Sequence, residues 1–151
     1  MRKIKSNKTF KPVCSDVGDE FYQNGIFKFN ITKLLKFVDL NKNKFQPEIV
    51  EVNSIRIFPF SILNEETIKK ANLDIPIILA EISPDRFNVI DGNHRLEKAY
   101  RAGIATISAY RLFSEQHIIF LTAIDAYKAY VEYWNTKADL NEEYNGIRKI
   151  S

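Results

Sequence analysis

The chain has 151 residues, of which 45% are hydrophobic and 27% are charged, and these values are typical of one globular domain. Cys14 is the single cysteine, so the composition excludes a disulfide framework within the chain and a zinc site made of cysteines. No apolar run approaches the roughly 20 residues that span a bilayer, and no secretory signal follows the N-terminal charges. We therefore expect a cytoplasmic protein without a membrane partner.

The positive charge is concentrated near the N-terminus. Residues 1–45 contain ten lysines and arginines against four acidic residues, whereas the rest of the chain contains twelve against fifteen. Two interpretations remain open: contact with a nucleic acid or other phosphate, or a solvated and partly disordered tail. The tail lacks the aromatic or arginine spacing that is typical of groove recognition, which favours the second interpretation. The basic residues concerned are Arg2, Lys3, Lys5, Lys8 and Lys11.

The first 45 residues predict a basic extension, a short strand and a helix. Residues 1–20 show no periodicity and are expected to form a loop. A short strand is expected at residues 26–29, after an Asn-Gly turn. Asn30 is expected to cap a helix that ends near Leu40, because apolar residues follow it at helical spacing.

Residues 47–112 predict a small mixed sheet with short helices. The segment 49–58 is rich in β-branched and aromatic residues and is followed by Pro59, so we expect a strand that ends there. Asn64 is expected to cap a short helix through Ala71. Further strands are expected at residues 75–82, 86–90 and 105–112.

Residues 113–135 predict a long C-terminal helix, with Ser114 as its N-cap and residues 136–151 frayed. Its apolar stripe is wide, which favours burial in the core. The alternative is a surface for a partner or a dimer, made of Tyr127, Tyr130, Tyr133 and Trp134. The stripe consists of Phe120, Ile124, Tyr127, Val131 and Trp134.

The most informative segment runs from residue 87 to Gly103. A short apolar strand ends at Asp91-Gly92, a pair that favours a turn, and a helix follows whose C-terminal residue precedes Gly103. A helix N-terminus offers free N–H groups and partial positive charge, so it can hold an anion. Arg95 adds a planar cation, and Gly92 allows close approach to the backbone. The residues therefore predict a ligand site between strand and helix.

The sequence Val-Ile-Asp-Gly-Asn-His-Arg-Leu-Glu-Lys-Ala at residues 89–99, the Ala102-Gly103 pair and the strand at 106–110 together resemble the signature of the ParB/sulfiredoxin superfamily. The upstream order of a strand ending in proline, a short helix and a Pro-Ile strand also agrees. Over residues 47–112 this resemblance implies an α+β fold with a small mixed sheet and packed helices. The loop is most similar to that of the free serine kinases of this fold.

The resemblance implies that the loop and the helix start hold the phosphates of a nucleotide, with ATP or CTP and Mg²⁺ as the expected ligands. Carried over by position, the nucleotide contacts would be Gly92, Asn93, His94 and Arg95. Asp91 and His94 are the candidate catalytic residues, since an imidazole can transfer protons near neutral pH. For Asp91, capping of the helix is an equally open interpretation.

Three departures from the superfamily bear on function. Asn93 stands where sulfiredoxins have a cysteine, so we expect no sulfinic acid reduction. No helix-turn-helix region follows the module, so we expect no site-specific DNA binding of the partition type. The catalytic glutamate of the serine kinases follows the first strand, where this chain has residues 57–60 and no acid; Glu51, Glu65 and Glu66 are the nearest carboxylates.

Two functions remain open. The first is a nucleotide-binding protein, with phosphotransfer or nucleotide hydrolysis as its reaction. The second is a non-catalytic regulatory or nucleic-acid-associated module that uses the same anion-binding loop and its basic N-terminal region.

Glu97 and Arg101 are expected to form a helix ion pair, and His117 is expected to be an ordinary first-turn residue of the last helix. A metal site made of His94, His117 and carboxylates has no recognised spacing, and none is expected.

Overall fold

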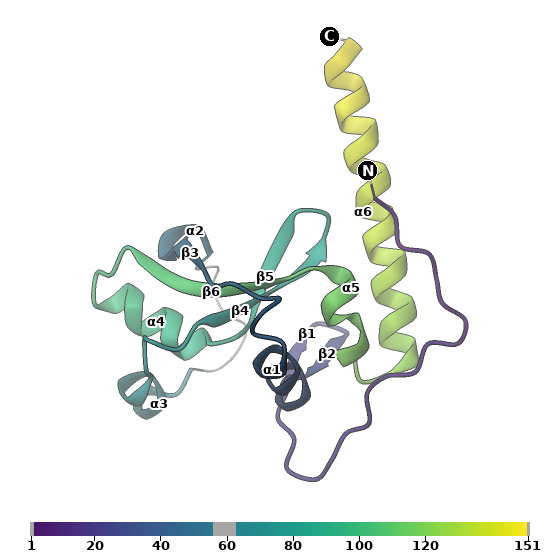
Figure 1. The fold of residues 1–151 in the computed structure, drawn as a ribbon. Coiled ribbons are helices and arrows are strands. Elements are labelled where there is room, and N and C mark those ends of the chain that lie inside the picture. Colours follow the sequence, from purple (N-terminus) through teal and green to yellow (C-terminus); the bar gives the residue numbers. More distant parts are fainter. Residues whose placement is uncertain (1, 56–62, 151) are drawn as a thin grey trace.

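A four-stranded mixed sheet lies at the centre of the computed structural model, which describes residues 2–55 and 63–150 (Figure 1). The strand order is β3-β6-β4-β5. β6 runs parallel to β4, and the β3–β6 and β4–β5 pairs are antiparallel. The sheet is mixed as expected, because a hairpin joins β4 to β5 and a helical crossover returns the chain to β6. The strands are β3 Glu48–Glu51, β4 Ile77–Ser83, β5 Arg86–Asp91 and β6 Thr106–Leu112.

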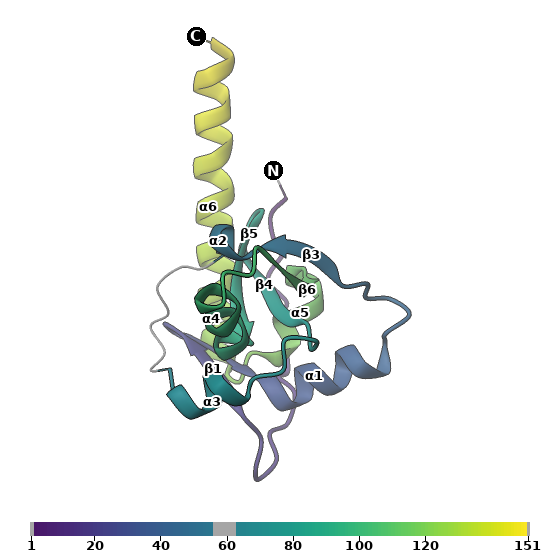
Figure 2. The ribbon, with the colours of Figure 1, turned by 90° about the vertical axis from the view of Figure 1, so that its left-hand side faces the viewer.

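Other elements cover both faces of the sheet, and β4 is therefore buried along its whole length. Ile78, Ala80 and Ile82 face one apolar cluster, which contains residues of the N-terminal hairpin and the C-terminal helix. Ile77 and Leu79 alternate with them and face a second cluster under helix α4, Asn93–Arg101. Figure 2 shows α4 and the short helix α3, Glu65–Lys70, on the side of the sheet that faces the viewer.

The N-terminal region forms the predicted strand and helix. β1, Phe21–Asn24, pairs with β2, Phe27–Asn30, and α1 follows directly at Ile31–Leu40. The predicted cap at Asn30 is confirmed, because its side chain accepts a hydrogen bond from the Lys33 N–H at 3.0 Å. Asn30 is fully buried, so this cap also joins the hairpin to α1.

The first predicted strand of the sheet is shorter than expected. β3 ends at Glu51, and residues Val52–Ile55 form the one-turn helix α2 instead. Glu51 pairs with Thr106, the first residue of β6, and one further bond joins the Val52 N–H to the Ala105 carbonyl at 2.9 Å before the chain turns into α2. The rest of the predicted strand, residues 56–58, lies outside the described residues.

The predicted long helix is interrupted. The helix α5, Ser114–His117, and the 3₁₀ turn η1, Ile118–Phe120, precede the long helix α6, Ile124–Ile150. Leu121 breaks the helix because it pairs with Phe29 of β2 in an isolated bridge and is fully buried there.

The helix boundaries differ from the prediction at both ends. Ser114 is the first residue of α5 and does not cap a long helix, and residues 136–150 continue α6 instead of fraying. In Figures 1 and 2 the C-terminal half of α6 extends beyond the rest of the molecule.

Residues 2–13, which we call the N-terminal arm, contain no helix or strand, as predicted, but they are not a solvated tail. They run along α6 and η1 (Figure 1). The Phe10 ring stacks on Tyr127 with 3.9 Å between centroids, and the Val13 N–H donates to the Ile119 carbonyl. The predicted stripe packs largely in the core as favoured above, because Phe120, Tyr127, Val131 and Trp134 are buried, but Ile124 is exposed. Of the residues of the alternative surface, Tyr130 is buried as well and Tyr133 is exposed.

The helix that follows the candidate loop has the expected boundaries. α4 ends before Gly103, which adopts a left-handed conformation with φ of +70°. The Gly103 N–H donates to Tyr100 O, and the Ile104 N–H donates to Ala99 O. These two bonds form a Schellman motif, which explains the glycine. The predicted cap of α3 is also confirmed, since the Asn64 side chain accepts from the Thr67 N–H.

Candidate functional site

Gly92 connects β5 to α4 at the centre of the candidate site. Its φ is +99°, a value that side chains rarely tolerate. A Cβ at this position would lie 2.5 Å from Ile77 Cγ2 and 2.8 Å from Arg95 Nη2. The glycine is therefore needed for internal packing as well as for the turn.

No side-chain cap closes the start of α4. Capping by Asp91, one of the two interpretations that the sequence left open, is not observed, because its carboxylate accepts from Arg95 Nη2 at 3.0 Å instead. The first backbone hydrogen bond of the helix runs from the Leu96 N–H to the Gly92 carbonyl. The N–H groups of Asn93, His94 and Arg95 precede that bond, at the positively charged end of the helix dipole.

Arg95 is held between two acceptors. Besides Asp91, its Nη2 donates to the Pro76 carbonyl at 3.3 Å. The side chains of Arg95 and Asp91 are 17% and 25% exposed, so this ion pair is only partly solvated. The Arg95 Nε is buried and has no hydrogen-bond acceptor among the residues that the structure describes. Arg95 thus supplies charge near the helix start while it also fixes Asp91.

His94 faces a different neighbour. Its Nε2 accepts a hydrogen bond from the Asn64 N–H at 3.2 Å, and Asn64 is the residue that caps α3. The imidazole therefore links the starts of two helices. Its side chain is partly exposed, so it can still meet a ligand.

A cavity of about 150 Å³ opens at this helix start. One water needs roughly 10–15 Å³ by this measure, so the cavity has room for a small polar group or several waters. Asp91, Gly92, Asn93 and His94 form one wall, so four of the five predicted site residues lie together. Arg95 lies behind Gly92 and is not part of the lining.

The opposite wall comes from the N-terminal hairpin, which the sequence did not associate with the site. Glu20, Phe21 and Tyr22 line it. The main chain of Glu20 is fixed at the start of α1, because its carbonyl accepts from Ile31 N and its N–H donates to Thr32 Oγ1. The sequence contains one feature that could have drawn attention to these residues, namely an acidic residue followed by two aromatic residues.

The carboxylates considered for the missing kinase glutamate have other surroundings. Glu65 forms a bidentate ion pair with Arg101, which lowers the pKa of Glu65 through hydrogen bonding. Arg101 also binds Glu97 at 3.1 Å, which confirms the predicted helix pair. Glu51 is exposed at the end of β3, and residues 57–60 all lie outside the described part of the chain.

His117 differs from its prediction. It is the last residue of α5, fully buried, and its Nε2 lies 2.6 Å from the Glu81 carbonyl. Burial lowers the pKa of His117 to about 4, so the ring is neutral near pH 7 and donates through Nε2. Tyr130 donates to the same carbonyl at 2.7 Å. Within the described ranges, no group of three or more potential metal ligands is placed to hold an ion.

A comparison with known protein families identifies the chain. The ParB N-terminal domain model matches residues 27–119, which is more than half of the sequence. The chain belongs to the ParB N-terminal domain family. The match begins in β2 and ends in η1, so it includes the sheet, α4 and the Asp91–Arg95 loop. It confirms the resemblance drawn from residues 47–112.

The ParB-domain match leaves out three parts of the molecule. The N-terminal arm, the strand β1 and the helix α6 lie outside residues 27–119. Glu20, Phe21 and Tyr22, which line the cavity, therefore also lie outside the match. No curated protein and no solved structure matches the chain. None of the helices described here is long and apolar enough to cross a membrane.

Proposed function

We propose that this ParB-like chain binds a nucleotide, ATP or CTP with Mg²⁺, and that a phosphate group of the nucleotide enters the cavity at the start of α4. The observation that carries the proposal is the helix start itself, which has no side-chain cap and borders a cavity. The starts of α1 and α3 are each closed by an asparagine side chain. A phosphate group is the ligand that an open helix start suits best.

Each predicted residue has a specific part in this proposal. The backbone N–H groups of Asn93 and His94 would donate to a phosphate, and the His94 ring would add a contact from the cavity wall. Gly92 holds the turn that exposes these groups, and Arg95 supplies positive charge from behind it. Asp91 is then a positioning residue for Arg95 as much as a catalytic candidate.

Mg²⁺ fits the charges around the cavity. Glu20 and Asp91 both border it, and their carboxylates would repel a bare phosphate. Glu20 and Asp91 are the residues that would hold a divalent cation, and its charge would offset that repulsion. When bound, it would neutralise charge on the phosphates. Phosphotransfer or hydrolysis is the reaction we infer for this site, with His94 and Asp91 as the side chains that would move or hold a proton.

Thermal unfolding tests the binding. Wild type is melted with Mg²⁺ and each of ATP, CTP, GTP and UTP, and a ligand at 100 times its dissociation constant should add about 2.7 kcal/mol to the free energy of unfolding. Arg95→Ala should lose the shift. Arg101→Ala is the matched control, because Arg101 lies on the same helix but pairs with Glu65 and Glu97. No shift with any nucleotide would refute the proposal, and a shift would justify a turnover assay.

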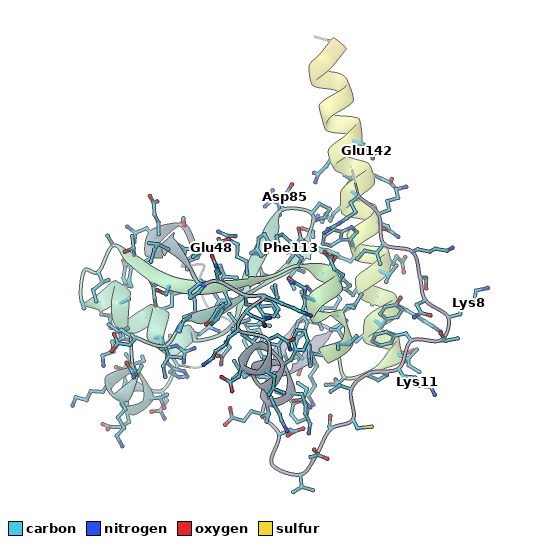
Figure 3. The ribbon with its side chains drawn as sticks, viewed as in Figure 1. Lys8, Lys11, Glu48, Asp85, Phe113 and Glu142 are labelled. Carbon is cyan, nitrogen blue, oxygen red and sulfur yellow. The ribbon has the colours of Figure 1, made fainter. Side chains whose placement is uncertain are left out.

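A second function rests on the arm. Lys8 and Lys11 point away from the molecule in Figure 3, whereas Arg2 and Lys3 form ion pairs with Glu81 and Asp139. Projecting lysines suit a polyanion such as a nucleic acid. Neutralising both in Lys8→Gln/Lys11→Gln should reduce the salt dependence of nucleic-acid binding by about two counterions. An unchanged slope would exclude the arm as the contact.

A further inference from the structure

Arg2 occupies a pocket built by segments that are far apart in the sequence. Its Nη2 lies 2.8 Å from Glu81 Oε1 and 3.4 Å from Ser114 Oγ, and its Nη1 lies 3.5 Å from Glu115 Oε2. The guanidinium carbon lies 5.1 Å from the centroid of the Trp134 ring, a cation–π distance. Two carboxylates, a hydroxyl and an indole face together make a site suited to a guanidinium.

Glu81 is the deepest part of this pocket, and the fold holds it in place independently of Arg2. Its side chain is 3% exposed, whereas that of Arg2 is 51% exposed. The Ser114 N–H donates to Oε1 at 3.3 Å, and the Asp85 N–H donates to Oε2 at 3.1 Å. Asp85 has a φ of +61°, and in this left-handed turn its N–H points at the carboxylate. The pocket is therefore preformed, and a cation is needed to balance a buried charge.

The side chains of α6 bind the arm through its main chain. The Asn135 amide accepts from Ile4 N at 2.8 Å and donates to Ile4 O at 3.0 Å, as a neighbouring strand would. Trp134 Nε1 donates to the Arg2 carbonyl at 2.8 Å. The Tyr127 hydroxyl accepts from Asn7 N at 2.7 Å. These contacts do not depend on which side chains the bound segment carries, so they suit any extended peptide.

The arm is loosely packed against this surface. A cavity of about 360 Å³ lies between the arm and the α5–α6 region. A second hollow of about 200 Å³ lies beside Arg2, bordered by Asp85 and Phe113 (Figure 3) and by Trp134. A segment without secondary structure that leaves such space belongs to the least stable part of a fold. We therefore expect the arm to leave its surface at a lower cost in free energy than unfolding of the sheet.

We propose that this surface is a peptide-binding groove that selects an arginine side chain, and that the arm is its ligand within the chain. The partner is an extended polypeptide segment that carries an arginine and, two positions later, an apolar residue. Arg2 and Ile4 show that pattern, because Arg2 enters the pocket and Ile4 packs against the core. The arm and the α6 side of the groove lie outside the ParB-domain match, whereas Glu81, Ser114 and Glu115 lie inside it; this proposal does not depend on nucleotide binding.

Arg2→Ala opens the pocket in the full chain and provides the first test. Trp134 is the only tryptophan, so its fluorescence reports directly on the site. Nα-acetyl-arginine amide should produce a saturable fluorescence change and raise the melting temperature of this variant. The citrulline analogue has nearly the same shape without the charge and should have no effect. Wild type should need at least tenfold more arginine amide, because its own arm competes.

A second variant makes the test specific. In Arg2→Ala/Glu81→Gln the buried carboxylate is gone, so the response to arginine amide should disappear. A peptide with the sequence of residues 2–8 should bind Arg2→Ala more tightly than arginine amide does, and its counterpart with alanine for arginine should bind at least tenfold more weakly. A folded Arg2→Ala that ignores arginine amide, or equal binding of both peptides, would overturn the proposal. Arg2→Gln replaces Arg2→Ala if circular dichroism shows the latter unfolded.

Discussion

The start of α4 and the Glu81 pocket contain the same residue types, but the first borders an open cavity and the second is filled by the N-terminal arm. Each pairs an arginine with a carboxylate, and each lies near one of the two histidines of the chain. At α4 the paired residues are Asp91 and Arg95, four residues apart in the sequence, and His94 borders a cavity. At the Glu81 pocket the arginine comes from the arm, and the pocket is filled.

The two sites have similar residues, but burial and the sequence distance between those residues determine whether a ligand from solution can reach them. His117 is buried against the Glu81 carbonyl and serves the scaffold, whereas His94 is partly exposed beside an uncapped helix. A site that is open and locally built is available to a small ligand from solution. A site that the chain closes with its own arm is available only to a ligand that displaces the arm. The following predictions test this contrast.

The largest expected effect is a pH dependence from His117. Its pKa is about 4 in the folded chain, because of burial, and near 6.5 when unfolded. The unfolded chain therefore binds the proton first, and the stability that neutral His117 contributes is fully present above pH 6.5. It falls as the pH drops toward 4, by about 3 kcal/mol in total.

Urea unfolding at several pH values measures this loss, and His117→Gln is the matched control because glutamine can donate to the Glu81 carbonyl but does not titrate. Subtracting the two curves removes the contributions of carboxylates such as Asp19 and Glu65, whose pKa values hydrogen bonds lower. Parallel curves between pH 7 and 4 would show that His117 is not buried as a neutral ring.

Glycine substitutions at the two ends of α4 test how tightly the open site is built. Gly92→Ala adds a Cβ in a left-handed conformation and within 2.5 Å of Ile77, so it should cost about 2–3 kcal/mol. Gly103→Ala is the control, since that residue is also left-handed but has no atom within 4 Å of the added Cβ; it should cost about 1 kcal/mol. Chemical denaturation of both variants checks the order. Equal losses would mean that Ile77 and Arg95 give way easily.

The features that the sequence predicted are those that depend on nearby residues. Asn30 and Asn64 cap helices that begin one residue later, and Gly103 follows the last turn of α4. Four of the five residues predicted for the site border one cavity, because they follow each other along the chain. Whether they bind a nucleotide stays a prediction.

The features that the sequence missed depend on distant partners. β3 ends at Glu51, opposite the start of β6 at Thr106, and the last helix breaks at Leu121 because Phe29 pairs with it. Arg2 and Glu81 are 79 residues apart, and nothing local indicates that they meet. For the same reason the hairpin wall of the cavity could not be predicted.

Exchanging each paired carboxylate for its amide compares the two regions directly. Glu81→Gln should cost about 2 kcal/mol, because the buried carboxylate accepts from Arg2 and from two backbone N–H groups, and an amide replaces one of its oxygens with a donor. Asp91→Asn should cost about 1 kcal/mol, since the Asp91 side chain is 25% exposed whereas that of Glu81 is 3% exposed. Thermal unfolding of both variants at neutral pH gives the difference. The reverse order would show that the local pair contributes more to the scaffold than the buried one.

The smallest effect on stability should come from His94→Ala. This variant therefore best distinguishes a loss of nucleotide binding from a loss of folding stability. The ring accepts one bond, at 3.2 Å from the Asn64 N–H, which can bond to water when the ring is removed because Asn64 is exposed. The loss should be about 0.5 kcal/mol, within the reach of a careful melt. The stabilisation by Mg²⁺ and the bound nucleotide should fall much further, whereas Arg101→Ala should leave it intact. If the nucleotide shift survives His94→Ala unchanged, the phosphate is held by the backbone of α4 alone, and His94 belongs to the contact between α4 and α3.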